Sequence, residues 1–279
     1  MESACVQTTD GVPYTLKAPF DFSFLKKYGK VFTVFDKQDS GNVCFGVEKD
    51  GKRCFVKFAG APAQLYTGRP EDAIHRLKCA VPVYKDLAHP NLVRLVKAEE
   101  IGGGFAAVFE WVNAVCMGKQ YPLDRQKFMQ FPIGRKMRIF EDIMAFHAHV
   151  SAKNYVAIDF YDGSVMHDFD NAQTFVCDID SYEKAPFRGD ENLWGSTRFM
   201  SPEERVNGAV IDEVTNVYTM GATAFVLFAD NDRSEKAWPL GMALFAVAQK
   251  AVSNDRGKRQ QSIRGLMNEW ENAKTKECL

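Results

Sequence analysis

The sequence predicts an α+β fold, in which a strand-rich N-terminal part, residues 1–112, precedes a mainly helical part, residues 113–279. Two observations support this. Up to Val112 the apolar residues fall in short runs bounded by turn residues, which is typical of strands. After Asn113 they recur at helical spacing over long stretches. We therefore expect an antiparallel sheet with one helix, followed by several packed helices.

The strands of the first part come in hairpins. VFTVF is followed by NVCFGVEKDGKRCFVKF, in which the Asp50-Gly51 pair marks a tight turn. LVRLVKAEE and GFAAVFEWV form a second pair, separated by glycines. Between the pairs, residues 70–87 have apolar residues at helical spacing, but Pro82 is expected to bend or split this helix.

The second part contains four stretches with the apolar spacing of helices. Short strand-like runs that carry Asp159 and Asp178 lie between the first two stretches. The stretches are residues 131–153, 210–228, 240–254 and 260–274.

Composition limits the class of protein. The chain has 279 residues, of which 46% are apolar and 25% charged, as in globular proteins. A formal net charge of −1 gives no reason to expect a nucleic-acid or membrane partner. The seven cysteines are scattered and include no CxxC pair, which favours free thiols in a reducing compartment. Without a signal pattern or a run long enough to span a membrane, we expect a cytoplasmic protein.

Three charged residues have the chemistry of phosphoryl transfer. Lys57 closes the run CFVKF, Asp159 lies in AIDFYDGS, and Asp178 lies in VCDID. Phosphoryl transfer needs a cation on the nucleotide phosphates, a carboxylate that holds Mg²⁺, and a second carboxylate that orients the acceptor hydroxyl. Each residue alone is equally well explained as a solvated strand end. Their order and separation favour a shared site.

Several further motifs fall in a familiar order. After CFVKF come HPNLVRL, VFEWV, AIDFYDGS, VCDID, GSTRFMSPEE and NVYTMG. In this layout the chain resembles the eukaryotic-type protein kinase family, from about Phe32 to Trp270, as a divergent Ser/Thr protein kinase-like domain that would suit a bacterial cytoplasm. The resemblance implies a bilobal fold: a β-rich nucleotide-binding lobe, a helical catalytic lobe, and ATP bound between them with Mg²⁺.

The resemblance also implies roles for individual residues. Asp159 corresponds to the catalytic-loop Asp, Lys57 to the phosphate-binding Lys, and Ser196 to the residue that hydrogen-bonds the catalytic Asp. Asp178 corresponds to the Asp that binds Mg²⁺. Ser164 stands where the family has an Asn that holds the second Mg²⁺. The positions that would contact the nucleotide are Gly41, Val43, Lys57, Glu110, Val112 and Met166. Arg259 stands where the family has an Arg that pairs with the Glu of the Pro202-Glu203 pair.

Departures from the family concern the nucleotide site and the catalytic loop. Of the glycine-rich loop only Gly41 and Val43 remain, so fewer bare amides could approach the phosphates. Phe55 replaces the small residue over the adenine, which should crowd a purine. Ile158 replaces the Arg before the catalytic Asp, so a phosphorylated activation segment would have no cation to pair with at this position. Ala80 stands where a Glu should pair with the Lys. Glu71 or Asp72 would have to serve instead, which requires that the helix is set differently.

Three smaller substitutions complete the comparison. Tyr161 replaces a Lys of the catalytic loop, Asn216 replaces the Asp of the central helix, and the DFG triplet reads Asp178-Ile179-Asp180. His147 and His149, two apart on a predicted helix, point to different faces and do not form a metal pair.

These patterns together predict an ATP-dependent phosphotransferase that transfers the γ-phosphoryl group to a hydroxyl. A Ser/Thr protein kinase is the first interpretation, with a protein hydroxyl as acceptor. The short stretch before Arg259 removes surface that protein kinases use for docking, which favours a small-molecule acceptor instead. A third interpretation is a pseudokinase, a scaffolding module in which Phe55 and Ala80 reflect lost catalysis.

Overall fold

The computed structural model describes residues 5–189, 193 and 195–278. The fold is α+β, and the chain divides into two compact units. The first unit consists of the chain up to Lys85 together with Val93–Val112, and the second of Asp86–Leu92 together with the chain from Asn113 onward. Residues 86–92 belong to the second unit partly through a hydrogen bond from the amide of Val176 to the carbonyl of Asn91, 2.6 Å long.

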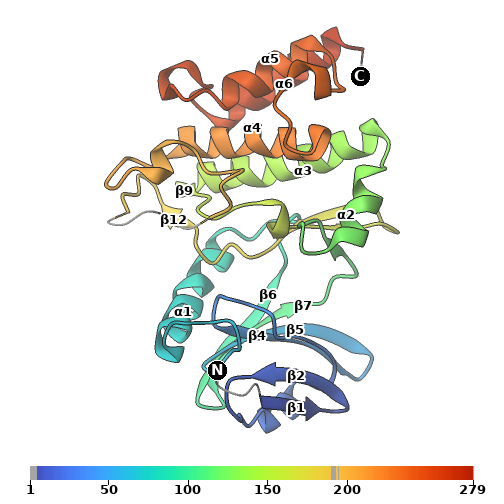
Figure 1. Cartoon of the computed structure of the whole chain (residues 1–279), viewed down its shortest axis with the longest axis vertical. Helices are drawn as coiled ribbons and strands as arrows, with labels where there is room; N and C mark the ends of the chain where they lie inside the picture. The colour runs from blue at the N-terminus through green and yellow to red at the C-terminus, as the bar shows by residue number, and fades with distance from the viewer. Residues whose placement is uncertain (1–4, 190–192, 194, 279) are drawn as a thin grey trace. The chain divides into compact units, whose positions relative to one another are not determined.

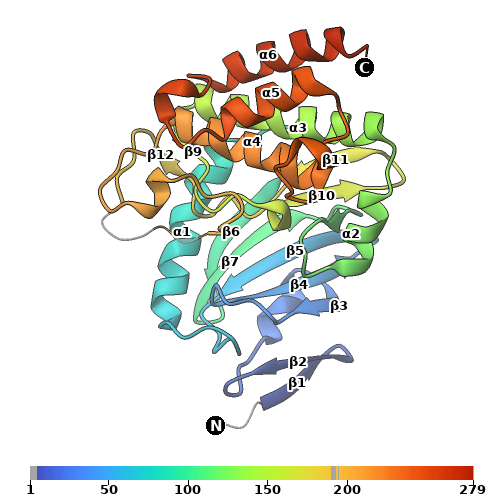
Figure 2. The ribbon, with the colours of Figure 1, turned by 45° about the horizontal axis from the view of Figure 1, so that its top comes forward.

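The first unit is built on a five-stranded antiparallel sheet with the strand order β3-β4-β5-β7-β6 (Figures 1 and 2). Its turn between β4 and β5 is the predicted one, because Asp50 and Gly51 both have positive φ angles, 52° and 73°. A two-residue hairpin turn of this hand matches the twist of the strands. The strands are β3 (Lys30–Phe35), β4 (Asn42–Lys49), β5 (Lys52–Ala59), β6 (Leu95–Ile101) and β7 (Gly104–Glu110).

The helix of the first unit, α1 (Pro70–Asp86), continues through Pro82. Of the two predicted effects of this proline, bending or splitting the helix, splitting is therefore wrong. Pro82 lies on the exposed face, one turn before the helix ends, where the carbonyl that loses its amide partner can be hydrated. The opposite face is apolar, and Ala73, Leu77 and Ala80 are buried.

An N-terminal hairpin precedes the sheet and was not predicted. It consists of β1 (Cys5–Thr9) and β2 (Val12–Leu16), which turn at Asp10-Gly11 with positive φ angles at both residues. A single turn of 3₁₀ helix, η1 (Ser23–Lys27), follows it. Aromatic rings join these elements to the sheet: Phe22 lies 4.8 Å from Phe45, centroid to centroid, in the buried core.

The second unit is mainly helical. Helices α3 and α4 lie side by side, and α5 and α6 pack over them (Figures 1 and 2). Helix α4 is buried along almost its whole length, so it forms the centre of the unit. The four long helices match the predicted stretches, whereas the short α2 was not predicted. The helices are α2 (Pro122–Met129), α3 (Ile133–Ala152), α4 (Glu213–Ala229), α5 (Met242–Ala251) and α6 (Ile263–Lys276).

Two small antiparallel sheets accompany these helices. One has the order β11-β10-β8, with β8 (Val115–Cys116), β10 (Val165–Asp168) and β11 (Gln173–Val176). The other pairs β9 (Tyr155–Val156) with β12 (Glu183–Lys184). The loops that leave β9 and β11 carry Asp159 and Asp178, so these sheets fix the starting points of both loops.

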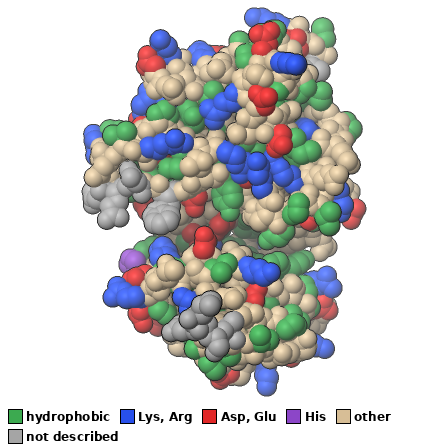
Figure 3. Space-filling model, viewed as in Figure 1, with side chains coloured by type: hydrophobic (Ala, Val, Ile, Leu, Met, Phe, Trp, Pro, Cys, Tyr) green, Lys and Arg blue, Asp and Glu red, His purple; other side chains and the backbone are tan. Residues whose placement is uncertain are grey.

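Acidic and basic side chains lie interspersed on the visible face of each unit (Figure 3). This fits the near-neutral formal charge of the chain. Within the part of the chain that the structure describes, no helix is both long and apolar enough to span a bilayer.

Candidate active site

Three aspartates among the described residues of the second unit have positive φ angles: Asp230, which caps the end of α4, and the two predicted site residues, Asp159 and Asp178. Asp159 has a φ angle of 61° and Asp178 one of 56°. For a residue with a Cβ atom this region costs on the order of 1 kcal/mol, although Asp tolerates it better than most residues. Such positions concentrate at functional sites, where the surrounding structure holds them in place.

The loop that carries Asp159 is held by Asn216 of α4. The Asn216 Oδ1 atom accepts a hydrogen bond from the amide of Ala157 at 2.8 Å, and its Nδ2 atom donates to the carbonyl of Tyr155 at 3.0 Å. A third hydrogen bond, 3.1 Å long, runs from Nδ2 to Ser151 Oγ. Asn216 is buried, so these bonds are shielded from water. They fix the backbone two residues before Asp159.

The loop that carries Asp178 is tied to the same region. The amide of Cys177 donates to the carbonyl of Ser164 at 2.8 Å, which places the residue before Asp178 against the end of the Asp159 loop. Between them, β10 and β11 form a hairpin whose turn is held by Asp168: its Oδ1 accepts from the amides of Asp170 and Asn171, both at 2.9 Å. The Asp168 side chain thus stabilises the hairpin turn that joins the two strands.

Two tyrosines show that both carboxylates act on one small region. Burial, followed by the charges of Asp178 and Asp159, raises the pKa of Tyr161. The pKa of Tyr182 is also raised by burial, and the thiol of Cys177 and the same two carboxylates add to the effect. Both carboxylates therefore disfavour ionisation of both phenols, and the hydrogen bond from Cys177 to Ser164 independently joins the loops that carry them. Asp159 is half-buried and Asp178 exposed, so both side chains face a place that solvent can enter.

Tyr182 is held by a buried histidine. Its hydroxyl lies 3.0 Å from His147 Nε2, and the other ring nitrogen, Nδ1, lies 2.8 Å from the carbonyl of Ile143. Nδ1 must donate to that carbonyl, so Nε2 accepts from the tyrosine. Burial lowers the pKa of His147 to about 4, which keeps the ring neutral. His147 therefore positions Tyr182 and is not a metal ligand.

Oxygen atoms suited to Mg²⁺ are present in this region. The hydroxyl of Ser164 is fully buried and has no hydrogen-bond partner within the described residues. Asp178, which supplies a carboxylate, comes directly after Cys177, whose amide is hydrogen-bonded to the carbonyl of Ser164. Magnesium prefers such hard oxygen ligands and keeps several waters or phosphate oxygens of its own. No group of three or more His, Cys, Asp or Glu side chains among the described residues has the geometry of a protein-only metal site.

The segment that carries Ser196 lies next to Asp159. A Cβ atom built on Gly195 would lie 3.4 Å from Asp159 Oδ1. The carbonyl of Ser196 accepts from the amides of Phe199 and Met200, at 2.9 and 3.2 Å, so residues 196–200 form a compact turn. Ser196 is half-buried at the start of this turn.

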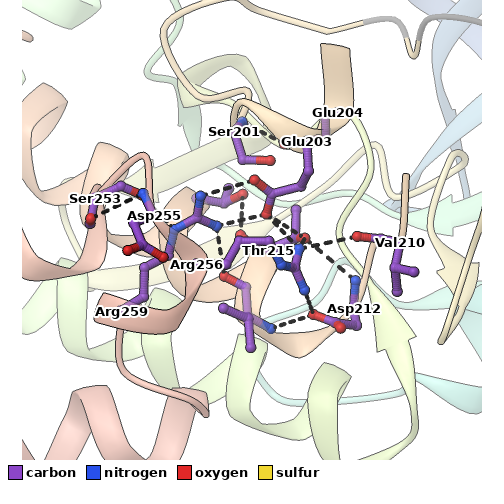
Figure 4. Close-up of polar contacts among 12 residues, drawn as sticks. Ser201, Glu203, Glu204, Val210, Asp212, Thr215, Ser253, Asp255, Arg256 and Arg259 are labelled. Atoms are coloured by element: carbon purple, nitrogen blue, oxygen red, sulfur yellow. Dashed lines mark hydrogen bonds and ion pairs between the residues drawn. The ribbon is translucent and has the colours of Figure 1, made fainter. Parts of the chain in front are cut away.

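The end of this segment is held by the predicted ion pair. Arg259 donates to Glu203 through both ends of its guanidinium group, at 2.7 and 2.9 Å, and both side chains are buried. Arg256 and Thr215 also donate to Glu203 Oε1, at 2.7 and 2.9 Å (Figure 4). The pairing of Arg259 with Glu203 is confirmed.

The remaining predicted residues, except Met166, lie in the first unit. Lys57 is buried on β5, where its register partners are Cys44 on β4 and Ala107 on β7. Gly41 has a φ of 83°, and a Cβ atom there would lie 2.8 Å from Tyr66 and from Ala73. The sequence therefore needs glycine at this position for packing as well as for backbone shape.

The other predicted nucleotide contacts sit near the ends of strands. Val43 is buried on β4, Glu110 ends β7 and pairs with Arg94, and Val112 is half-buried beyond β7. Met166 belongs to the second unit, on β10 opposite Cys116.

Phe55 is packed among other rings. It lies 5.8 Å from Phe35 and 6.4 Å from Phe109, centroid to centroid, within the first unit. Asp72, one of the acidic residues considered beside Ala80, is paired with Arg69 at 2.8 Å, and Ala80 itself is buried.

No model of a known protein family matches this chain, and no curated protein matches it.

Proposed function

We propose that the chain is an ATP-dependent phosphotransferase with a bilobal kinase-like fold, which transfers the γ-phosphoryl group of ATP to a hydroxyl. The supporting observation is the convergence of Asp159 and Asp178. Two loops from separate small sheets, joined by the hydrogen bond from Cys177 to Ser164, carry the two carboxylates on residues with positive φ, and both carboxylates raise the pKa of the same two tyrosines. A structural role for either aspartate would not require the other.

The two carboxylates would have different tasks. Asp159 would accept a hydrogen bond from the acceptor hydroxyl and take its proton as the oxygen attacks the γ-phosphorus, while the bond from that phosphorus to the β-phosphate oxygen breaks. Asp178 and the Ser164 hydroxyl would hold Mg²⁺. The ion would supply charge neutralisation on the phosphate oxygens.

Lys57 would supply the cation on the nucleotide phosphates. Its side chain stands on a central strand of the sheet, with hydrogen-bonded neighbours on both sides, so its backbone is rigid. In such a site, rate enhancement comes mainly from positioning and from charge stabilisation. A protein Ser/Thr hydroxyl is the acceptor we favour, with a small-molecule alcohol as the alternative.

One observation favours a second function, a pseudokinase that acts as a scaffold. Phe55 stands where the resemblance expects a small residue over the adenine, and it contacts Phe35 and Phe109. A ring at this position would have to rotate for a purine to enter. In this second interpretation the two aspartates would remain without binding a nucleotide.

Thermal unfolding with and without ATP and Mg²⁺ separates the two functions. A ligand that binds only the folded state raises the midpoint by mass action. We expect a Mg²⁺-dependent rise for the natural protein, which is lost in Lys57→Met and Asp178→Asn. Lys52→Met, which removes an exposed lysine from the same strand, serves as the control and should keep the rise.

Asp159→Asn tests the catalytic step. This variant should still bind ATP but should fail to transfer labelled phosphate to a protein or alcohol acceptor. Absence of any midpoint shift at saturating nucleotide, with Phe55→Ala no better, would reject the phosphotransferase and favour the scaffold.

A further inference from the structure

A buried carboxylate lies in the catalytic loop, three residues after Asp159. Asp162 accepts two hydrogen bonds from Arg198, from Nη2 to Oδ1 at 2.8 Å and from Nη1 to Oδ2 at 2.9 Å. Arg125 donates to the same Oδ2 at 2.8 Å. The Asp162 side chain is only 1% exposed. This arrangement plays no part in the roles proposed above.

The three residues come from three separate segments of the second unit. Asp162 begins the 3₁₀ turn η2 (Asp162–Ser164), Arg125 lies on α2, and Arg198 lies in the turn of residues 196–200. Arg125 also bonds the carbonyl of Met117, at 3.2 Å, and so is itself fixed. A paired charge at this depth contributes little net stability, but it allows only the arrangement that satisfies it. The bidentate pair therefore sets where the turn sits against the catalytic loop.

Two more arginines hold the backbone of the same turn. Arg233 donates to the carbonyl of Arg198 at 3.0 Å, and Arg205 donates to the carbonyl of Thr197 at 2.9 Å. The contacts that position the turn thus come from arginines and one carboxylate of this chain.

The residue directly before Asp159 cannot form an ion pair with this turn. Ile158 is buried in a small apolar cluster with Val156 and Ile211. An aliphatic side chain in such surroundings cannot pair with an anionic group on the neighbouring segment. Ion pairing of this segment with the catalytic loop therefore takes place at Asp162 and not at residue 158.

We propose that Asp162 is a positioning residue: its ion pair with Arg198 holds the turn of residues 196–200, and with it Ser196, beside Asp159, so that the site is assembled without phosphorylation. The catalytic half of this inference rests on the proposed function. The structural half concerns the chain alone.

Hydrogen exchange of the unliganded full chain tests the structural half. Asp162→Asn keeps the shape of the side chain but removes the charge shared by two guanidinium groups, so amides of residues 196–205 should exchange at least roughly tenfold faster. Arg198→Gln should have the same effect, and Arg198→Lys, which keeps one charged donor, an intermediate one. Asp230→Asn is the matched control, because Asp230 binds Arg125 at 2.5 Å from a 60% exposed position. It should leave the turn unchanged.

The outcomes separate this inference from the proposed function. If exchange in residues 196–205 is as slow in both Asp162→Asn and Arg198→Gln as in the natural protein, the positioning role of Asp162 is wrong, whatever the activity. If exchange in the two variants becomes faster but the natural protein transfers no phosphate, Asp162 keeps its positioning role and the proposed function fails.

Where transfer is measurable, Asp162→Asn should lower kcat about tenfold or more while leaving the KM for ATP unchanged. Arg198→Lys should restore part of the loss. Prior phosphatase treatment of the natural protein should change neither exchange nor kcat. A fall in kcat after that treatment would overturn the proposal that the site assembles without phosphorylation.

Discussion

Glu203 and Arg259 are joined by two parallel hydrogen bonds, from Nη1 to Oε1 at 2.7 Å and from Nη2 to Oε2 at 2.9 Å. Burial opposes the charged form of Glu203, but the hydrogen bonds and charge of Arg259 outweigh it, and the pKa of the carboxyl lies below its ordinary value. The pair connects the segment after Ser196 to the loop between α5 and α6. It thereby holds the end of this segment to the helical core.

Arg259→Met is expected to lower the free energy of unfolding by about 3–5 kcal/mol, because it leaves the buried Glu203 carboxylate with only part of its compensation. Chemical denaturation, followed through the unfolding transition of the second unit, measures this loss. Arg264→Met removes an exposed arginine from α6 and should change the free energy by less than about 0.5 kcal/mol. Equal losses in the two variants would show that the pair is unimportant.

The pKa of the neighbouring Glu204 is shifted upward, in the opposite direction to that of Glu203. Burial raises its pKa to about 7, although a hydrogen bond from the amide of Ser201, 2.6 Å long, favours the charged form. Between the unfolded value of 4.5 and about 7, the folded protein holds a proton that the unfolded chain has released. The contribution of Glu204 to stability is therefore fully present below pH 4.5 and falls as the pH rises to about 7.

Glu204→Gln isolates this effect, because the amide oxygen can still accept from Ser201 but cannot ionise. Between pH 4.5 and pH 8, the free energy of unfolding of the variant should rise relative to that of the natural protein by up to about 3 kcal/mol. Denaturation of both proteins is measured across this pH range, and the difference between them is used. The difference is needed because burial lowers the pKa values of His147 and His167 to about 4, which makes the stability of both proteins rise with pH in part of the same range. Parallel curves would contradict the assignment to Glu204.

A third prediction concerns the hydrogen bond between Tyr182 and His147. Tyr182→Phe removes the donor and leaves His147 Nε2 buried without a partner, which should cost about 1–3 kcal/mol of unfolding free energy. His147→Phe should cost a similar amount. If the two groups depend on each other, the double variant should lose less than the sum of the single losses, by about 0.5–3 kcal/mol. Additive losses would mean that the bond contributes nothing measurable.

The elements that follow from local sequence were predicted well. The turn at Asp50-Gly51 needs two residues that accept positive φ, and the four long helices have apolar faces that only a helix aligns. The hairpin at Asp10-Gly11 has the same turn signal and could have been found by the same rule. The helix does not split at Pro82, because the rule concerns the helix interior, whereas this proline is near the end and faces solvent.

The candidate site was predictable only where a residue type and its spacing carry the chemistry. Asp159, Asp178 and the pairing of Arg259 with Glu203 were predicted in this way, and the structure confirms the pairing. Tyr182 was missed, because its importance comes from long-range packing against residues distant in the sequence. Asp162 was missed for the same reason: its partner Arg198 is 36 residues away, and neither residue belongs to a periodic pattern.

Two glycines should respond to alanine in opposite directions. Gly221 lies inside α4, where a Cβ atom would be 2.6 Å from the Cβ of Ala251 and 2.9 Å from Val252 Cγ1. Helices α4 and α5 approach so closely there that Gly221→Ala must push them apart, at a cost of about 1–3 kcal/mol. Gly134 lies near the start of α3, exposed, with no atom within 4 Å of the added methyl group. Gly134→Ala reduces the freedom of the unfolded chain and should stabilise by about 0.5–1 kcal/mol.

Thermal and chemical unfolding of the two variants measure this contrast. The same chemical change is made in two helices of one unit, so any general effect of glycine replacement cancels in the comparison. A stabilising effect of Gly221→Ala would mean that the contact between α4 and α5 is looser than the positions of Ala251 and Val252 require.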